Sequence, residues 1–216
     1  MTVVGVFGGT FDPVHKGHVQ MALSALSHLE LDRVHLIPCH QPPHRGKPSL
    51  TSRERLHLLS LAVEGHEGLV VDDRELKRSG LSWTVDTLKD LRRELGEEVS
   101  LVLLMGADAY SSLTQWHQWQ ELPKLAHIGV FLRPGYALPG EGVLADWMSS
   151  SSTGEASVTN VHGSALGCVL ALNQPQIELS ATDIRQQLAL GFIPKGLEPN
   201  VRDYIVSKQL YGFRDK

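Results

Sequence analysis

Residues 3–18, VVGVFGGTFDPVHKGH, decide the fold of this chain. The apolar run at residues 3–7 predicts a short buried strand of a parallel sheet. Gly8-Gly9-Thr10 follows, where the backbone can turn sharply and approach a ligand closely. His15 and His18 then open a helix, three residues apart and therefore on one face, beside the unpaired N–H groups of its first turn. A strand, a glycine turn and a helix start with two imidazoles predict an anion site, with phosphate as the anion.

The two histidines admit other interpretations as well. Histidines on a helix face are commonly surface residues, and a pair at this spacing can bind zinc. Further ligands could come from Cys39, His40 and His44, but their spacing fits no zinc pattern. The glycine turn directly before the pair favours phosphate contact. Neither GxxxxGK[ST] nor GxGxxG occurs, which excludes the ordinary P-loop and the dinucleotide fingerprint.

Composition limits the class of protein. With 216 residues, 42% of them hydrophobic, the chain can build one sizeable α/β domain. A net charge of -4 argues against a general nucleic-acid or membrane-surface binder. The two cysteines show no disulfide or metal spacing, so a reducing compartment is expected. No signal peptide and no membrane-spanning run is recognised, and we therefore expect a cytoplasmic protein.

Apolar patterning along the chain predicts strands that alternate with helices. This alternation predicts a Rossmann-like, doubly wound and mostly parallel sheet flanked by helices, in a single domain of residues 1–216. Residues 137–164, rich in glycine, proline and serine, are expected to form a variable loop or insertion, and residues 180–216 a small C-terminal helical part. Further strands are expected at 34–38, 69–71, 99–105, 128–132, 169–172 and 177–179. Helices are expected to begin at residue 15, at Thr51 with a capping box to Glu54, and at Ser82 or Thr84. Two more helices are expected at 183–190 and 201–210.

Several ordered motifs carry a resemblance to a known family. GGTFDPVHKGH resembles the phosphate-binding motif of the HxGH nucleotidylyltransferase superfamily, and residues 179–185, LSATDIR, resemble its ISSTxIR element. Motifs between them are similar to those of the nicotinate-nucleotide adenylyltransferase family of bacterial NAD synthesis: PPH at 42–44, SWTVDTL at 82–88, Gly106-Ala107-Asp108 with Trp116, and RPGY at 133–136. The resemblance covers most of the chain, apart from about residues 137–170.

The resemblance implies transfer of AMP from ATP to nicotinate mononucleotide, with deamido-NAD and pyrophosphate as products. Direct attack of one phosphate on the α-phosphorus of ATP needs no protein nucleophile, only positioning and charge relief. Two anionic substrates would repel each other without cationic groups. His15, His18, Lys47 and Arg185 are the expected groups, together with Mg²⁺ that enters on ATP rather than on protein side chains.

The resemblance also implies the roles of individual residues. His18, His15 and Arg185 are the expected catalytic residues. The ATP and phosphate contacts are expected from Gly8, Gly9, Thr10, Phe11, His15, His18, Lys47, Gly106, Asp108, Ser180, Thr182 and Arg185. Nicotinate mononucleotide is expected to contact His44, Thr84, Trp116 and Arg133, with Trp116 stacked on the pyridinium and backbone N–H groups at Thr84 reading the carboxylate. Asp108, given above among the ATP contacts, could also hold a ribose hydroxyl of this second substrate.

Each assignment has a plainer alternative. His44 and Lys47 could belong to a solvated basic loop, Trp116 could be a core residue as is expected of Trp119, and Asp108 could be a helix N-cap. Ala181 departs from the second serine of ISSTxIR, so one hydroxyl contact to ATP is missing.

Two further functions remain open from the sequence. One is another HxGH enzyme, such as a pantetheine-phosphate adenylyltransferase or a cytidylyltransferase, and the other is a non-catalytic nucleotide-binding homologue. No nucleic-acid or membrane partner is expected. The oligomeric state is open, with a homo-oligomer among the possibilities.

Overall fold

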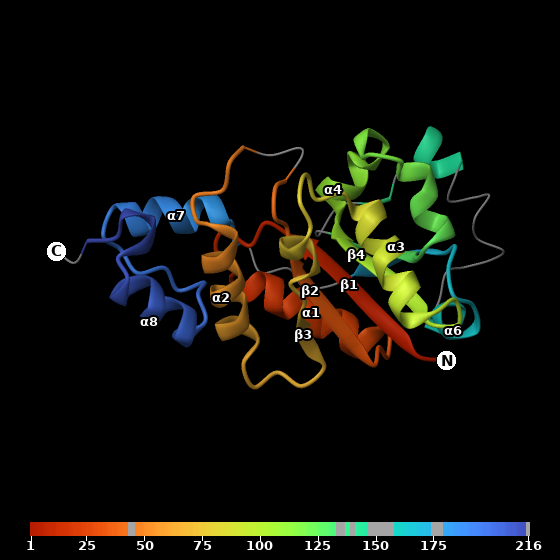
Figure 1. Cartoon of the computed structure of the whole chain (residues 1–216), viewed down its shortest axis with the longest axis horizontal. Coiled ribbons are helices and arrows are strands. Elements are labelled where there is room, and N and C mark those ends of the chain that lie inside the picture. Colours follow the sequence, from red (N-terminus) through yellow and green to blue (C-terminus); the bar gives the residue numbers. More distant parts are fainter. Residues whose placement is uncertain (43–45, 133–136, 139–140, 147–157, 174–178, 215–216) are drawn as a thin grey trace.

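The computed structural model describes residues 1–42, 46–132, 137–138, 141–146, 158–173 and 179–214. Its centre is a six-stranded sheet in the order β3-β2-β1-β4-β5-β6 (Figure 1). Every neighbouring pair of these strands is parallel, which confirms the predicted doubly wound α/β class. The strands are β1 Val3–Gly9, β2 Arg33–Pro38, β3 Leu69–Val71, β4 Ser100–Gly106, β5 His127–Leu132 and β6 Val169–Asn173.

Helices cover both faces of the sheet, as the near-continuous apolar strands require. One face packs against α1, α2 and α6, and the other against α3 and α4. Figure 1 shows α7 and α8 beyond α2, away from the sheet, as a C-terminal helical part. The described helices are α1 Lys16–His28, α2 Ser52–Val63, α3 Thr84–Leu95, α4 Ala107–Ser111, α6 Val158–Gly163, α7 Ala181–Ala189 and α8 Pro199–Ser207, with 3₁₀ turns at Arg74–Lys77 (η1), Leu113–Gln115, Trp119–Lys124 and Leu210–Gly212.

The start of α2 follows local capping chemistry. Thr51 accepts a hydrogen bond from the Glu54 backbone N–H, and the Glu54 carboxylate accepts one from the Thr51 N–H at 2.9 Å. This reciprocal capping box confirms the predicted helix start. Helix α2 buries Arg55, Leu58 and Leu59 against the core, whereas Leu56 is half-buried.

Two expected segments take other forms. Val158–Gly163 is helix α6 rather than part of a continuous loop, because the fully buried Val161 anchors it to the core and His162 hydrogen-bonds the Leu29 carbonyl oxygen at 3.0 Å. Around Trp116 the chain forms the short helix α4 and two 3₁₀ turns. In the proposed strand at 177–179, Leu179 has no strand structure, and residues 177 and 178 lie outside the described residues.

Candidate functional site

The site lies where the sheet changes its winding direction. The chain leaves β1 toward β2 on one side, and β4 lies on the other side of β1. In doubly wound sheets this switch point, at the carboxyl ends of the strands, is where ligands bind. Gly8 is the next-to-last residue of β1 and Gly106 the last of β4, and a Cβ added to either would meet no atom within 4 Å. Nearer the start of β1, in contrast, a Cβ on Gly5 would lie 2.9 Å from the Leu31 side chain. The two strand ends therefore border open space.

The turn after β1 is held by packing and by a buried guanidinium. Phe11, at φ 49° and 2% exposed, tucks its ring under the turn, where a Cβ on Gly9 would lie 2.9 Å from that ring. Arg55 of α2, which is 1% exposed, donates from Nη1 to the Thr10 carbonyl oxygen and from Nη2 to the Cys39 carbonyl oxygen, both at 2.6 Å. These bonds tie the loops after β1 and β2 together. Buried charge of this kind is retained only where several acceptors satisfy it.

His15 and His18 stack on one another at the start of α1. Their ring centroids are 3.7 Å apart with a 27° angle between planes, and the edge of Phe11 packs on His18. The His15 backbone N–H donates to Nδ1 of His18 at 3.2 Å. Nδ1 of neutral His18 is therefore unprotonated, so its proton sits on Nε2. Gly17 leaves the room for this stack, because a Cβ there would lie 3.0 Å from Nδ1 of His15.

The two rings differ in their surroundings. His15 is 7% exposed, whereas His18 is half-buried. Burial lowers the pKa of His15 to about 4, and a hydrogen bond with its own backbone offsets part of that effect. His15 is thus neutral near pH 7 before any anion binds. The expectation that it is a resident cation is wrong for the free protein, and it instead offers a neutral ring to a ligand.

This depressed pKa predicts a loss of stability in mild acid. In the unfolded chain His15 takes up a proton near pH 6.5, while in the folded chain it does so only near pH 4. The unfolded state therefore binds more protons as the pH falls, and the free energy of unfolding should drop by about 2 kcal/mol between pH 7 and pH 5. Denaturant unfolding at several pH values would measure it.

The control is a variant that lacks the titrating ring. His15→Gln should flatten the pH dependence in this range, whereas His28→Gln, at an exposed position of the same helix, should retain it. Burial also lowers the pKa of His127, so some slope of the same sign should persist in His15→Gln. An equal slope in His15→Gln and the parent would contradict the assignment.

The C-terminal part closes on the site through Asp12. This buried carboxylate accepts hydrogen bonds from the Tyr211 hydroxyl at 2.9 Å and from the Ser49 backbone N–H at 2.7 Å. Its backbone carbonyl oxygen accepts a bond from Nη1 of Arg185 at 2.7 Å. Lys16 N–H at the first turn of α1 donates to the Gly196 carbonyl oxygen at 2.9 Å, so this N–H is already paired. The turn after β1 and the C-terminal helices are thus held together by hydrogen bonds.

The ISSTxIR-like element lies at the start of α7. Ser180 is the N-cap, and its hydroxyl accepts from the Asp183 N–H at 3.4 Å. Thr182 accepts from Nη2 of Arg185 at 3.2 Å, which fixes the plane of the guanidinium. An open hollow beside Arg185 is lined by Ser49, Thr182, Gln186, Ala189 and Tyr211. Ala181 is the first residue of α7, and the cap and the arginine are intact without a second serine.

The residues expected to bind the second substrate lie at the start of α3, in α4 and directly after the 3₁₀ turn Leu113–Gln115. Thr84 is the first residue of α3, and Trp83 before it packs its ring 4.7 Å from that of His117. Trp116 is half-buried against the core on the α3 face, as is Trp119. Asp108 is exposed in the first turn of α4, whose N-cap is Gly106. The alternative of Asp108 as an N-cap is therefore wrong.

Three expected site residues remain: two lie outside the described part of the chain, and one is on an exposed loop. His44 and Arg133 lie outside the described residues, and Lys47 is exposed on the loop before α2. Within the described part of the chain, no three His, Cys, Asp or Glu side chains gather as a metal site. In the same part, no helix is long and apolar enough to cross a membrane.

Sequence reasoning missed the supporting residues Asp12, Arg55 and Tyr211. Arg55 could have been noticed, because it stands three and four residues before Leu58 and Leu59 on the apolar face of a predicted helix. The Asp12–Tyr211 contact joins residues 199 positions apart and has no local pattern.

Comparison with known proteins agrees with this geometry. The cytidylyltransferase-like family matches residues 6–187. A "probable nicotinate-nucleotide adenylyltransferase" of Marinobacter nauticus is 44% identical over 210 residues, which cover 97% of this chain and 96% of the relative. A protein of the same name from Cellvibrio japonicus is 40% identical and covers 96% of this chain and 98% of its own length.

A solved structure shows the same fold. The nicotinic acid mononucleotide adenylyltransferase of Plasmodium falciparum, complexed with APC, superposes with a TM-score of 0.72 over 99% of both chains at 17% identity. The family match and the full-length relatives together give the conclusion: this chain is a cytidylyltransferase-like protein and belongs to the nicotinate-nucleotide adenylyltransferase family.

Proposed function

We propose that this protein transfers AMP from ATP to nicotinate mononucleotide, releasing pyrophosphate and forming deamido-NAD, a step of NAD biosynthesis. The observation that carries the proposal is the stacked His15–His18 pair at the switch point of the sheet, closed by Arg185 through its bond to Asp12. Full-length relatives named for this activity support the choice of substrates. So does the Plasmodium falciparum enzyme, which was solved in complex with APC and with NaAD.

The chemistry is a direct in-line displacement. The phosphate of the mononucleotide attacks the α-phosphorus of ATP, the bond to the β-phosphate oxygen breaks, and pyrophosphate leaves with the electron pair. His18 presents its Nε2–H to the oxygens on which charge builds, because its Nδ1 is engaged by the His15 N–H. Donors fixed in this way act mainly through positioning and electrostatics. No covalent enzyme intermediate is needed.

Mg²⁺ is proposed to arrive with ATP. Among the described residues, no group of three or more His, Cys, Asp or Glu side chains could hold a metal ion. Bound to the triphosphate, Mg²⁺ would neutralise part of the phosphate charge. Arg185 and the exposed Lys47 would add positive charge from the protein, and Ser180, Thr182, Gly8, Gly9, Thr10, Phe11 and Gly106 would line the ATP side.

The acceptor is proposed to lie between α3 and α4. Backbone N–H groups at the start of a helix have no partner within the helix and can donate hydrogen bonds to an anion. The turn at Thr84 would therefore bind the carboxylate of the nicotinate ring. Trp116 would stack on the pyridinium, and Asp108 would bind a ribose hydroxyl. His44 and Arg133 are proposed partners of the mononucleotide phosphate.

Replacement of the stacking ring should affect the acceptor and not ATP. Trp116→Ala is expected to raise KM for nicotinate mononucleotide about tenfold, because stacking on a flat cationic ring contributes about 1–2 kcal/mol. The KM for ATP should stay near its parent value. Trp119→Ala is the matched control, since this ring also packs on the core and lies three residues away. Equal effects of both variants on KM would remove Trp116 from the acceptor site.

The activity is tested by pyrophosphate release with ATP and Mg²⁺. Nicotinate mononucleotide, nicotinamide mononucleotide and phosphopantetheine are offered in parallel, and preferred turnover of the first is expected. Absence of turnover with all three would refute the enzyme and favour a nucleotide-binding homologue. Preference for the amide would refute acid specificity, and preference for phosphopantetheine would favour the alternative enzyme.

Two further features belong to the same proposal. A cytoplasmic location fits the two free cysteines, Cys39 and Cys168. A homo-oligomer stays a prediction, which size-exclusion chromatography with light scattering would test.

A further inference from the structure

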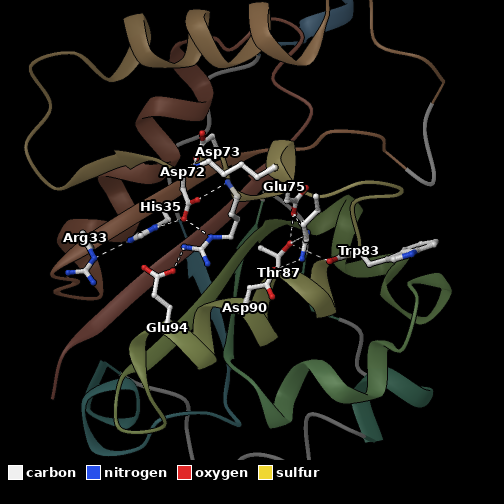
Figure 2. Close-up of polar contacts among 12 residues, drawn as sticks. Arg33, His35, Asp72, Asp73, Glu75, Trp83, Thr87, Asp90 and Glu94 are labelled. Atoms are coloured by element: carbon white, nitrogen blue, oxygen red, sulfur yellow. Dashed lines mark hydrogen bonds and ion pairs between the residues drawn. The ribbon is translucent and has the colours of Figure 1, made fainter.

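A buried carboxylate beside the acceptor region has no part in the chemistry above. Glu75 lies in η1, between β3 and α3, and is 7% exposed. Burial raises its pKa, and hydrogen bonds from Thr87 and Ser82 oppose that rise. Figure 2 shows Glu75 directed at Thr87, with Trp83 also next to Thr87. Burying a carboxylate costs free energy, so the groups that contact Glu75 indicate which part of the chain it holds in place.

The partners of Glu75 lie on both sides of the Trp83-Thr84 turn. The Thr87 hydroxyl, in the first turn of α3, donates to Oε1 of Glu75 at 2.6 Å. Ser82 stands one residue before the N-cap Trp83, and its hydroxyl also opposes the rise in the Glu75 pKa. The carboxylate therefore faces the residues that precede and follow the turn.

Arg78 completes the polar contacts of Thr87. Its Nη2 donates to the Thr87 hydroxyl oxygen at 2.6 Å, and its Nη1 donates to Asp90 one turn further along α3 at 2.8 Å. The Thr87 hydroxyl thus accepts from Arg78 and donates to Glu75, and its oxygen also lies 3.4 Å from the Trp83 carbonyl oxygen, so it ties α3 to the turn before it. A threonine with both roles filled cannot be replaced by an apolar isostere without leaving buried groups unpaired.

The same contacts hold the loop that follows β2. The His40 N–H donates to the Ser82 hydroxyl oxygen at 2.8 Å, and the Ser82 N–H donates to the Gln41 carbonyl oxygen at 3.0 Å. This loop leads toward His44, a proposed contact of the acceptor phosphate. The positions of the loop and of the helix start are therefore coupled through Ser82 and Glu75.

We propose that Glu75 is a positioning residue for acceptor specificity, which acts through Ser82 and Thr87 to fix the Trp83-Thr84 turn. The inference rests on the proposed function, in which that turn binds the nicotinate carboxylate. A carboxylate satisfies two outward N–H groups, whereas an amide turns an N–H₂ toward one of them, so a rigid turn rejects the amide. A turn that can shift accommodates the amide and binds the acid less well.

A second polar cluster at the other end of α3 supplies the matched control. Nδ1 of His35 hydrogen-bonds Asp72 at 2.8 Å, and Arg74 bridges Asp72 to Glu94 in the last turn of α3. Figure 2 shows this cluster apart from Glu75 and Thr87. It joins the same helix to the sheet, but away from the Thr84 turn, so Glu94→Gln tests general loosening of α3.

The test compares Thr87→Val, Thr87→Ser, Glu75→Gln and Glu94→Gln in the pyrophosphate assay. Thr87→Val should raise KM for nicotinate mononucleotide about tenfold and lower the acid-over-amide ratio of kcat/KM by about the same factor, with KM for ATP unchanged within about twofold. Thr87→Ser, which keeps the hydroxyl, should retain most of the parent discrimination. Glu75→Gln should show an intermediate loss. Glu94→Gln should keep both acceptor parameters, whatever it does to the Tm.

The outcomes separate this inference from the proposed function. If the parent uses nicotinate mononucleotide while Thr87→Val and Glu75→Gln keep its KM and discrimination, the positioning role alone is refuted. If KM for ATP rises equally, or Glu94→Gln produces the same loss, the effect is general destabilisation and the role is again refuted. If the parent uses no acceptor, the proposed function fails and the inference falls with it.

Discussion

His18→Ala is expected to lower kcat about a thousandfold while the fold stays intact. The half-buried ring presents its Nε2–H at the switch point, and removal of one fixed donor from a site of charge development costs roughly 10²–10³ in rate. Because the lost interaction forms mainly in the transition state, kcat and kcat/KM should fall together. Steady-state pyrophosphate release with both substrates varied would measure this.

The control for His18→Ala comes from the same helix. His28 is exposed near the end of α1 and hydrogen-bonds the Ser24 carbonyl oxygen at 2.9 Å, so His28→Ala should keep full activity. Thermal unfolding of both variants should stay within a few degrees of the parent, since neither residue is a large buried side chain. A parent-like kcat in His18→Ala would remove this residue from the mechanism.

Arg185→Lys is expected to lower kcat/KM for ATP about a hundredfold even though the positive charge remains. The guanidinium donates through Nη1 to the Asp12 carbonyl oxygen and through Nη2 to Thr182, which fixes its plane beside the site. A lysine ammonium cannot reproduce that fork or a bidentate phosphate contact. Arg185→Ala, which also loses the charge, should be slower still, by roughly a thousandfold.

Arg202 of α8 provides the comparison for Arg185. It pairs with the exposed Asp203 at 2.7 Å in the same C-terminal part, so Arg202→Ala should leave kcat/KM for ATP at the parent value. Initial rates with ATP varied at saturating acceptor would distinguish the variants. Full activity of Arg185→Lys would show that charge alone suffices and that the fork is not used.

The sheet could be predicted because its strands are buried on both faces. Apolar runs such as that of β4, bounded by a glycine, identify such strands without tertiary information. The start of α2 was equally local, since a Thr51–Glu54 box needs only four residues. Helix α6 was not predictable, because six residues carry little periodicity and Val161 is buried only by the assembled core.

The site divides in the same way. The His15–His18 spacing and the glycine turn are local, and they indicated a phosphate site before any tertiary contact was known. The groups that hold it are distant: Arg55 reaches the Thr10 carbonyl oxygen across 45 residues, and Glu75 reaches Thr87 across 12. The protonation of His15 was misjudged for the same reason, because its pKa depends on burial that only the fold supplies.

The bond between Asp12 and Tyr211 also has a consequence for how the protein is made. The ribosome makes the chain from its N-terminus onward, so the glycine turn emerges early. The Tyr211 hydroxyl that hydrogen-bonds Asp12 emerges 199 residues after it. Arg185 reaches the Asp12 carbonyl oxygen with a similar delay of 173 residues. During synthesis, then, the nascent chain contains the HxGH segment long before it can present a finished nucleotide pocket. The contacts of Asp12 with Arg185 and Tyr211 can form only after both of these residues have left the exit tunnel.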